Sequence, residues 1–231
     1  MCKNKQDLYR IDVSNLLLQE RAEKLFWSMS GFSKENPPSP YQKDEVQQME
    51  QKLQKKIKVK VLLQKVHFYR FEEGFMTIED KTIYYDLPLH LYKNQIIGAY
   101  AFLVSEETLA NDRQDTLDQL YTHMWQNAYL DAAREWVKEY LSQQTGEYVS
   151  SCISPGFYGI DLAHMKTMYQ MVDGKSLGVS VREDGLLYPE KSVLGMYLLL
   201  KHEIDVFGKQ CNHCLAQGKN CEFCVEKIEK I

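Results

Sequence analysis

Residues 154–159, Ser-Pro-Gly-Phe-Tyr-Gly, form the most informative short segment of this sequence. Pro155 fixes one backbone angle, and Gly156 and Gly159 allow the chain to pass close to another group. A helix is expected directly after this segment, over residues 161–172. A loop in that position can present backbone N–H groups to a carboxylate or a phosphate. A tight turn that only connects two elements has the same composition, so both interpretations stay open.

The residues before this loop alternate between helical and extended patterns. Apolar positions recur every three or four residues over 117–141, which predicts the longest helix of the chain. The nine-residue apolar run 96–104 predicts a buried central strand, and Ser-Glu-Glu-Thr at 105–108 predicts the start of a helix. One long strand or two short strands are expected at 57–71, with a hairpin partner at 76–78 and 82–86, and helices are expected at 8–29 and 44–56.

The residues after the loop predict a second hairpin. Strands are expected at 177–182 and 192–200, with a turn at Asp184-Gly185. Between them lies the polar string Glu190-Lys191-Ser192, preceded by Tyr188-Pro189. A hairpin turn with solvated charges would explain this string without any binding role.

Length, composition and charge exclude several classes of protein. The chain has 231 residues, of which 44% are hydrophobic and 26% charged, as in an ordinary folded protein of one large or two small domains. The apolar runs 96–104 and 193–200 are too short to span a bilayer, and the polar N-terminus does not resemble a signal peptide. The net charge of −4 gives no reason to expect nucleic-acid binding.

Four of the six cysteines lie close together near the C-terminus. Cys211 and Cys214 form one C-x-x-C pair, and Cys221 and Cys224 form another. Four thiolates at this spacing suit Zn²⁺ or an iron–sulfur cluster, and the pattern indicates a reducing, cytoplasmic location. Reduced free thiols, or disulfides formed on oxidation, remain the alternatives.

Taken together, three segments resemble a known family. Ser154–Phe157, Gly178–Val181 and the run 188–195, Tyr-Pro-Glu-Lys-Ser-Val-Leu-Gly, are similar in order and separation to motifs of the reactivation (S-adenosylmethionine-binding) domain of cobalamin-dependent methionine synthase. The resemblance is strongest to its free-standing relatives in anaerobic bacteria. It implies an α+β fold with an antiparallel twisted sheet flanked by helices. The implied division is an N-terminal helical arm at 1–56, a core at 57–205 and a Cys-rich tail at 206–231.

The resemblance also implies a function and a site. The domain would hold S-adenosylmethionine in a shallow groove, so that its methyl group reaches a reduced corrinoid on a partner protein or a cobalamin-dependent methyltransferase. A flavodoxin or ferredoxin would supply the electron. Such a site positions its ligand and needs no acid–base residue, so no catalytic residue is predicted. The implied binding residues are Glu135, Cys152, Ser154, Pro155, Gly156, Phe157, Tyr158, Tyr188, Lys191 and Ser192.

Two departures from the family pattern bear on this function. The family has an arginine where this chain has Cys152, and a tyrosine where it has Phe157. Losing a charge-assisted contact of about 1.5–3 kcal/mol weakens binding roughly 10- to 100-fold. Arg182 and Lys191 are the cations considered as replacements. A docking module for a corrinoid protein without S-adenosylmethionine binding, and an Fe–S electron donor that uses the cysteine tail, are therefore the alternative functions. For Glu135, the alternative to a binding role is that of a solvent-exposed charge on a helix.

Overall fold

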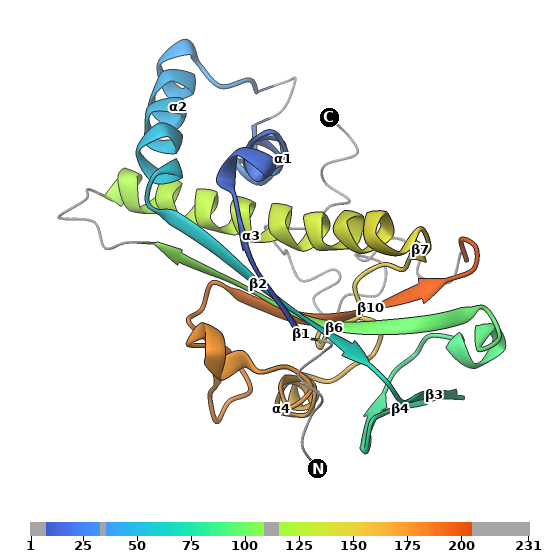
Figure 1. The fold of residues 1–231 in the computed structure, drawn as a ribbon. Coiled ribbons are helices and arrows are strands. Elements are labelled where there is room, and N and C mark those ends of the chain that lie inside the picture. Colours follow the sequence, from blue (N-terminus) through green and yellow to red (C-terminus); the bar gives the residue numbers. More distant parts are fainter. Residues whose placement is uncertain (1–7, 33–35, 109–115, 205–231) are drawn as a thin grey trace.

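A five-stranded antiparallel sheet forms the centre of the molecule. The computed structural model describes residues 8–32, 36–108 and 116–204. The strands of the sheet run in the order β1 (Leu8–Val13), β2 (Ile57–Val66), β6 (Ile96–Thr108), β10 (Ser192–Leu200) and β7 (Tyr148–Val149). All neighbours are antiparallel. Helices cover the sheet, so the α+β fold with an antiparallel sheet predicted from the sequence is confirmed (Figure 1).

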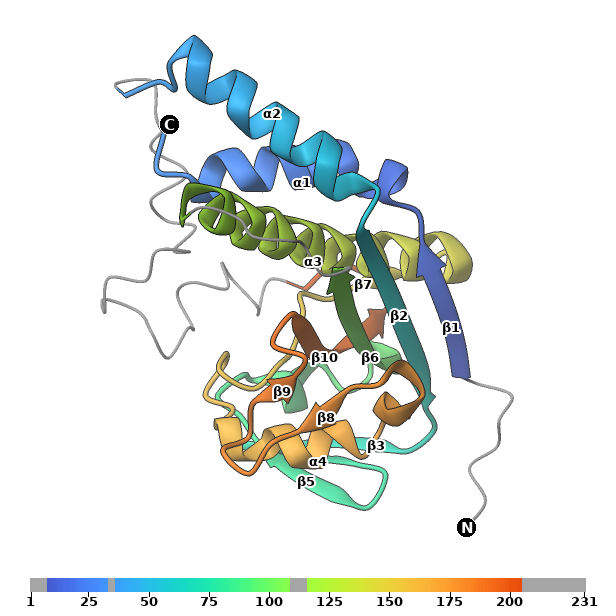
Figure 2. The same cartoon turned by 90° about the vertical axis from the view of Figure 1, so that its left-hand side faces the viewer.

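Three helices cover one face of this sheet. They are α1 (Asn15–Met29), α2 (Pro40–Gln54) and the long α3 (Thr116–Thr145), which crosses the strands (Figures 1 and 2). The buried face of α1 carries Leu18, Ala22 and Phe26 at four-residue spacing. Phe26 stacks on Trp125 of α3 with ring centroids 4.3 Å apart, which fixes α1 against α3.

Short elements cover the opposite face. They comprise β3 (Tyr69–Glu72), β4 (Phe75–Ile78), β5 (Lys81–Tyr84), the 3₁₀ helices at Leu89–Tyr92, Leu162–His164 and Gly174–Leu177, α4 (Met165–Tyr169), β8 (Ser180–Val181) and β9 (Leu187–Tyr188). Strands β3, β4 and β5 form a three-stranded sheet, and β8 pairs with β9. The central sheet therefore separates two hydrophobic cores, one beneath the three helices and one beneath these short elements.

Three sequence predictions about local structure are wrong. Residues 177–182 and 192–200 do not form a hairpin with each other, because β8 pairs with β9 while β10 pairs with β6 and β7 in the central sheet. Residues 8–13 form strand β1 at the edge of the sheet rather than the start of a helix (Figure 2). Residues 105–108 continue β6 rather than opening a helix, because they pair with the beginning of β2. The Lys60 ammonium lies 2.7 Å from the Glu107 carboxylate across these strands, so the charge of Glu107 is matched by a lysine of the neighbouring strand.

The predicted N-terminal arm is joined to the sheet through β1, so it is not helical throughout. Its separation from a core at 57–205 stays a prediction. The tail at 206–231 lies outside the described residues. Within the described part of the chain, every helix is too short or too polar to cross a membrane.

Candidate functional site

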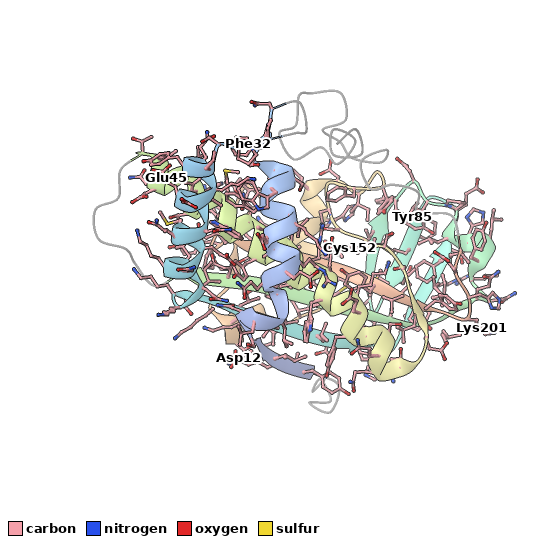
Figure 3. All side chains as sticks on the ribbon, turned by 90° about the horizontal axis from the view of Figure 1, so that it is seen from above. Asp12, Phe32, Glu45, Tyr85, Cys152 and Lys201 are labelled. Atoms are coloured by element: carbon pink, nitrogen blue, oxygen red, sulfur yellow. The ribbon has the colours of Figure 1, made fainter. Side chains whose placement is uncertain are left out.

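A cleft of about 1040 Å³ lies between the C-terminal half of α3 and the segment that follows it. Cys152, labelled in Figure 3, lies beside this half of α3. The lining comes from α3, the 148–152 segment, β10 and the residues after β10. It consists of Arg134, Glu135, Lys138, Glu139, Ser142, Tyr148, Val149, Ser150, Ser151, Cys152, Tyr197, Leu200, Glu203 and Ile204.

The segment that forms one wall is held in place by β10. The Ser150 N–H donates to the Leu198 carbonyl at 3.0 Å, and Ile153 exchanges backbone hydrogen bonds with Met196. In an extended chain neighbouring side chains point to opposite faces. Ile153 therefore packs in the core beneath the short elements, while Cys152 packs beneath the helices.

A glycine of β10 permits this close approach. A Cβ at Gly195 would lie 2.9 Å from the Cys152 Sγ, from the Ile153 carbonyl oxygen and from a ring carbon of Phe102. No larger side chain fits there without displacing backbone atoms. Gly195 thus fixes how near the segment with Cys152 lies to the sheet.

Positive charge in the cleft comes from α3. Arg134, Lys138 and Ser142 follow one another at four-residue spacing and share one face of the helix. The side chain of Arg134 is about one-fifth exposed, and its guanidinium lies 3.4 Å from the Asp131 carboxylate. Burial is the largest single influence on the Arg134 guanidinium and opposes its charge, but Asp131, Cys152, Tyr197 and Glu135 together outweigh burial and hold the pKa above its ordinary value. Arg134 is therefore a permanent cation in the cleft.

Negative charge comes from the adjacent positions of α3. Glu135 and Glu139 are half-exposed, and both contact Arg21 of α1. Burial raises the pKa of Glu135, while the guanidinium groups of Arg21 and Arg134 oppose that rise. The predicted helix carboxylate Glu135 therefore does line a cleft, but it already has a cation from the same chain as its partner.

Cys152 cannot replace the arginine that the family pattern has at its position. Its side chain is 4% exposed, and burial raises the pKa of the thiol to about 11, so it is neutral at physiological pH. The nearby cation is Arg134, which contributes to the electrostatics of the Cys152 thiol. Sequence reasoning missed Arg134. Its spacing from Lys138 and Ser142 was the available signal.

The Pro-Gly loop lies next to the cleft rather than in its lining. The Ser154 hydroxyl donates to the Leu194 carbonyl at 2.8 Å. The Gly156 N–H donates to the Ile160 carbonyl at 2.8 Å, and the Phe157 N–H donates to the Ser154 carbonyl at 3.2 Å. Both of these N–H groups are used inside the loop, which differs from the expectation that the loop presents them to an anion.

The remainder of the loop is built around a buried ring. Tyr158 is completely buried, with φ +54°, and its carbonyl accepts a hydrogen bond from the Asp86 N–H at 2.7 Å. Gly159 has φ +74°, and a Cβ there would overlap the Asp86 carboxylate. Pro155 is buried, whereas Phe157 is partly exposed. The loop is a tight structural turn in this conformation.

The other predicted residues gather near the beginning of β10. The Lys191 ammonium donates to the Asn127 side-chain oxygen at 2.6 Å and lies 3.1 Å from both ring nitrogens of His123. The Ser192 and Ser105 hydroxyls form a buried pair at 3.1 Å, and Tyr188 is 60% exposed. Seven residues separate Asn127 from Arg134, which is about 10 Å along α3. Arg182 pairs with Asp184 at 2.9 Å in the β8–β9 turn, so neither proposed replacement cation lines the cleft.

The predicted metal site cannot be compared with this geometry. Cys211, Cys214, Cys221 and Cys224 lie outside the described residues, so zinc or an iron–sulfur cluster stays a prediction. Across 8–32, 36–108 and 116–204, no group of three or more His, Cys, Asp or Glu side chains is placed to hold a metal ion.

Comparison with solved structures places this geometry in a known architecture. The chain matches the crystal structure of the MetH reactivation domain bound to AdoHcy with a TM-score of 0.65. The chain has the fold of the MetH reactivation domain. The match covers 96% of this chain and 88% of the MetH reactivation domain structure, at 12% sequence identity. No protein-family model matches the sequence, and the search of curated proteins finds no match. The predicted resemblance to the MetH reactivation domain is therefore confirmed for the fold.

Proposed function

We propose that this protein binds S-adenosylmethionine in the α3 cleft and presents its methyl group to a reduced corrinoid carried by a partner protein. The observation that carries this proposal is Arg134, a permanent cation facing an open cleft, in a fold whose MetH representative was crystallised with AdoHcy. The cleft volume of about 1040 Å³ is sufficient for a nucleoside-sized ligand.

The lining matches the chemical groups of such a ligand. The guanidinium of Arg134 suits the ligand's carboxylate, because a planar fork can donate two parallel hydrogen bonds. Glu135, Glu139 and Glu203 provide carboxylates for an ammonium or a sulfonium group. Tyr148, whose side chain is 54% exposed, offers an aromatic surface to a purine base.

The proposed reaction places few chemical demands on this chain. A one-electron donor, such as a flavodoxin or ferredoxin, reduces Co(II) to Co(I) on the partner. The Co(I) electron pair then attacks the methyl carbon, a Co–C bond forms, the C–S bond breaks, and S-adenosylhomocysteine leaves. No proton is transferred in this step. The role of the chain is to hold the ligand in a productive orientation.

Isothermal titration calorimetry with the full chain tests this proposal. We expect S-adenosylmethionine and S-adenosylhomocysteine to bind, and adenosine to bind at least roughly 10-fold more weakly, because it lacks the carboxylate that Arg134 would hold. Adenosine is the matched ligand control, since it keeps the base and the ribose. If neither S-adenosylmethionine nor S-adenosylhomocysteine gives binding heat at millimolar concentration, the proposal is contradicted.

A specific observation favours a second candidate, a docking module that binds a corrinoid protein without the nucleotide. Cys152 is neutral, and Arg21 already occupies two cleft carboxylates. Retention of a corrinoid protein on the immobilised chain, equal with and without S-adenosylmethionine, would support this alternative. The role of the cysteine tail as an electron donor stays a prediction, to be checked by metal content and visible spectra after anaerobic purification.

A further inference from the structure

Arg21 of α1 connects the N-terminal region to the cleft. Its Nε lies 3.2 Å from Glu135 Oε2, and one of its terminal nitrogens donates to Glu139 Oε1 at 2.5 Å. The two glutamates are one helical turn apart on α3, so one planar guanidinium reaches both of them. The side chain of Arg21 is 27% exposed, and the side chains of its two partners are about half-exposed.

This contact changes the charge of the cleft. The lining contains two cations, Arg134 and Lys138, and three carboxylates, those of Glu135, Glu139 and Glu203. The lining alone therefore has an excess of one negative charge. Two charged groups outside the lining also contact it: Asp131 pairs with Arg134, and Arg21 lies on two of the three carboxylates. Arg21 therefore offsets one negative charge at Glu135 and Glu139.

Charge discrimination matters because the proposed ligand and its demethylated product differ by one charge. S-adenosylmethionine carries a positive sulfonium, whereas S-adenosylhomocysteine has a neutral thioether. Their base, ribose and amino-acid groups are the same, so contacts to those groups contribute equally to both affinities. The ratio of the two affinities reports the methyl contact and the electrostatic potential at the sulfur.

We propose that Arg21 is a specificity-determining residue that suppresses the preference of the cleft for a cationic ligand over its neutral analogue. This inference rests on the proposed function. While α1 is docked, the carboxylates of Glu135 and Glu139 are compensated, and the sulfonium gains little from them. Displacement of Arg21 restores the negative potential and favours the charged methyl donor.

The docking of α1 does not depend on this ion pair. Leu18, Ala22 and Phe26 are fully buried, and Phe26 stacks on Trp125. This apolar contact remains when Arg21 is replaced by a neutral side chain of similar length. Arg21→Gln is therefore expected to remove the charge while leaving the fold intact.

The test compares dissociation constants of both nucleosides for wild type and Arg21→Gln by calorimetry at low salt. The ratio is the dissociation constant of S-adenosylhomocysteine divided by that of S-adenosylmethionine. We expect this ratio to rise roughly 3- to 10-fold in Arg21→Gln, which means a stronger preference for S-adenosylmethionine, and the rise to shrink at high salt. Lys24→Gln is the matched control. It removes one positive charge from the same helix, but Lys24 pairs with Glu20 at 2.7 Å rather than with α3. Its ratio should stay within about twofold of wild type.

A second variant acts in the opposite direction. Glu139→Gln removes a carboxylate while Arg21 stays, so the ratio should fall below the wild-type value. An unchanged ratio in both variants, with both nucleosides still binding, would overturn this inference alone. If neither nucleoside binds wild type, the proposed function fails, and the specificity role of Arg21 fails with it.

Discussion

The two halves of α3 contact partly buried cations in opposite circumstances. In the N-terminal half, Lys191 reaches the helix from the beginning of β10 and is bound by Asn127 and His123. In the C-terminal half, Arg134 belongs to the helix itself and faces a cleft of about 1040 Å³. Burial lowers the pKa of Lys191, whereas at Arg134 burial is outweighed by Asp131 and other nearby groups, which hold the pKa above its usual value.

The difference shows which cation is available to a ligand. Lys191 uses its hydrogen bonds to join β10 to α3. Arg134 is compensated by a neighbouring carboxylate on its own helix and still borders open space. A cation that only connects two elements and a cation that borders a cleft look alike in sequence, and the open volume beside them distinguishes the two.

The largest expected effect is on the affinity for S-adenosylmethionine, measured after replacing each of these two cations. We expect Arg134→Ala to weaken binding of S-adenosylmethionine about 10- to 100-fold, because a charge-assisted contact of about 1.5–3 kcal/mol is lost. Lys191→Ala should cost less than about threefold, since Lys191 lies outside the cleft lining. Calorimetry on both variants gives the answer. A greater loss in Lys191→Ala would move the binding site to the beginning of β10.

The next effect concerns the wall of the cleft. Gly195→Ala should destabilise the protein by about 1–3 kcal/mol, because its Cβ meets the Ile153 backbone oxygen, the Cys152 sulfur and Phe102. Gly98→Ala, on neighbouring β6, is the matched control. The nearest atoms to its Cβ belong to the side chain of Leu199, and the closest of them, Cδ1 at 3.0 Å, can move. Urea denaturation should rank Gly195→Ala as the less stable variant, and equal midpoints would argue against a rigid cleft wall.

Helix α2 provides a third case, a carboxyl group that is buried where α2 packs on its neighbours. Glu50 is 7% exposed, and its pKa is raised by burial and by Glu23 of α1, while the nearby Gln19 and Tyr129 side chains oppose that rise. A raised folded-state pKa means that stability is greatest below the unfolded value of 4.5 and declines as the pH rises through the folded-state value. Glu50→Gln should therefore gain about 1 kcal/mol at neutral pH.

Thermal unfolding at several pH values measures this gain. At pH values below 4.5 the variant and wild type should be equally stable, because the carboxyl is then protonated in both states of wild type. A gain that persisted unchanged into acid would show that its cause is packing and not ionisation.

The smallest effect belongs to His123 beside Lys191. Burial and the Lys191 charge lower the pKa of His123 below 6.5. The neutral ring is favoured in the fold, so this contribution is present above pH 6.5 and is lost as the pH falls through the folded-state value. Since His123 is exposed, solvent screening keeps the change under about 0.5 kcal/mol. His123→Asn should flatten the dependence of unfolding free energy on pH, and an unaltered slope would assign the acid sensitivity to other groups.

Long, regular elements were predictable from the sequence. The nine-residue apolar run predicts most of β6, and three- and four-residue spacing predicts α3. Predictions failed where a neighbouring strand decides the conformation. Ser105 to Thr108 look like a helix start, yet they extend β6 because β2 pairs with them. Leu8 and Ile11 have helical spacing, although residues 8–13 pair with β2 as an edge strand.

The site was predictable only in part. Glu135 and Cys152 were expected near one ligand, and both line the cleft. The predicted residues of the Pro-Gly loop and the beginning of β10 are absent from this lining, as are Arg182 and Lys191. Arg134 was missed because its four-residue spacing from Lys138 and Ser142 indicates a shared helix face but does not show that this face borders a cleft.

The sequence alone determined the periodicity of the longest helix and of the central strands, and the motifs that resemble the reactivation domain. These properties depend on local spacing, which a one-dimensional pattern retains. Only the tertiary structure decided that Arg134 borders the cleft, that Arg21 from a distant helix compensates its carboxylates, and that Lys191 is used internally. Such pairings depend on distances between residues more than sixty positions apart, and the packing of helices on the sheet sets those distances.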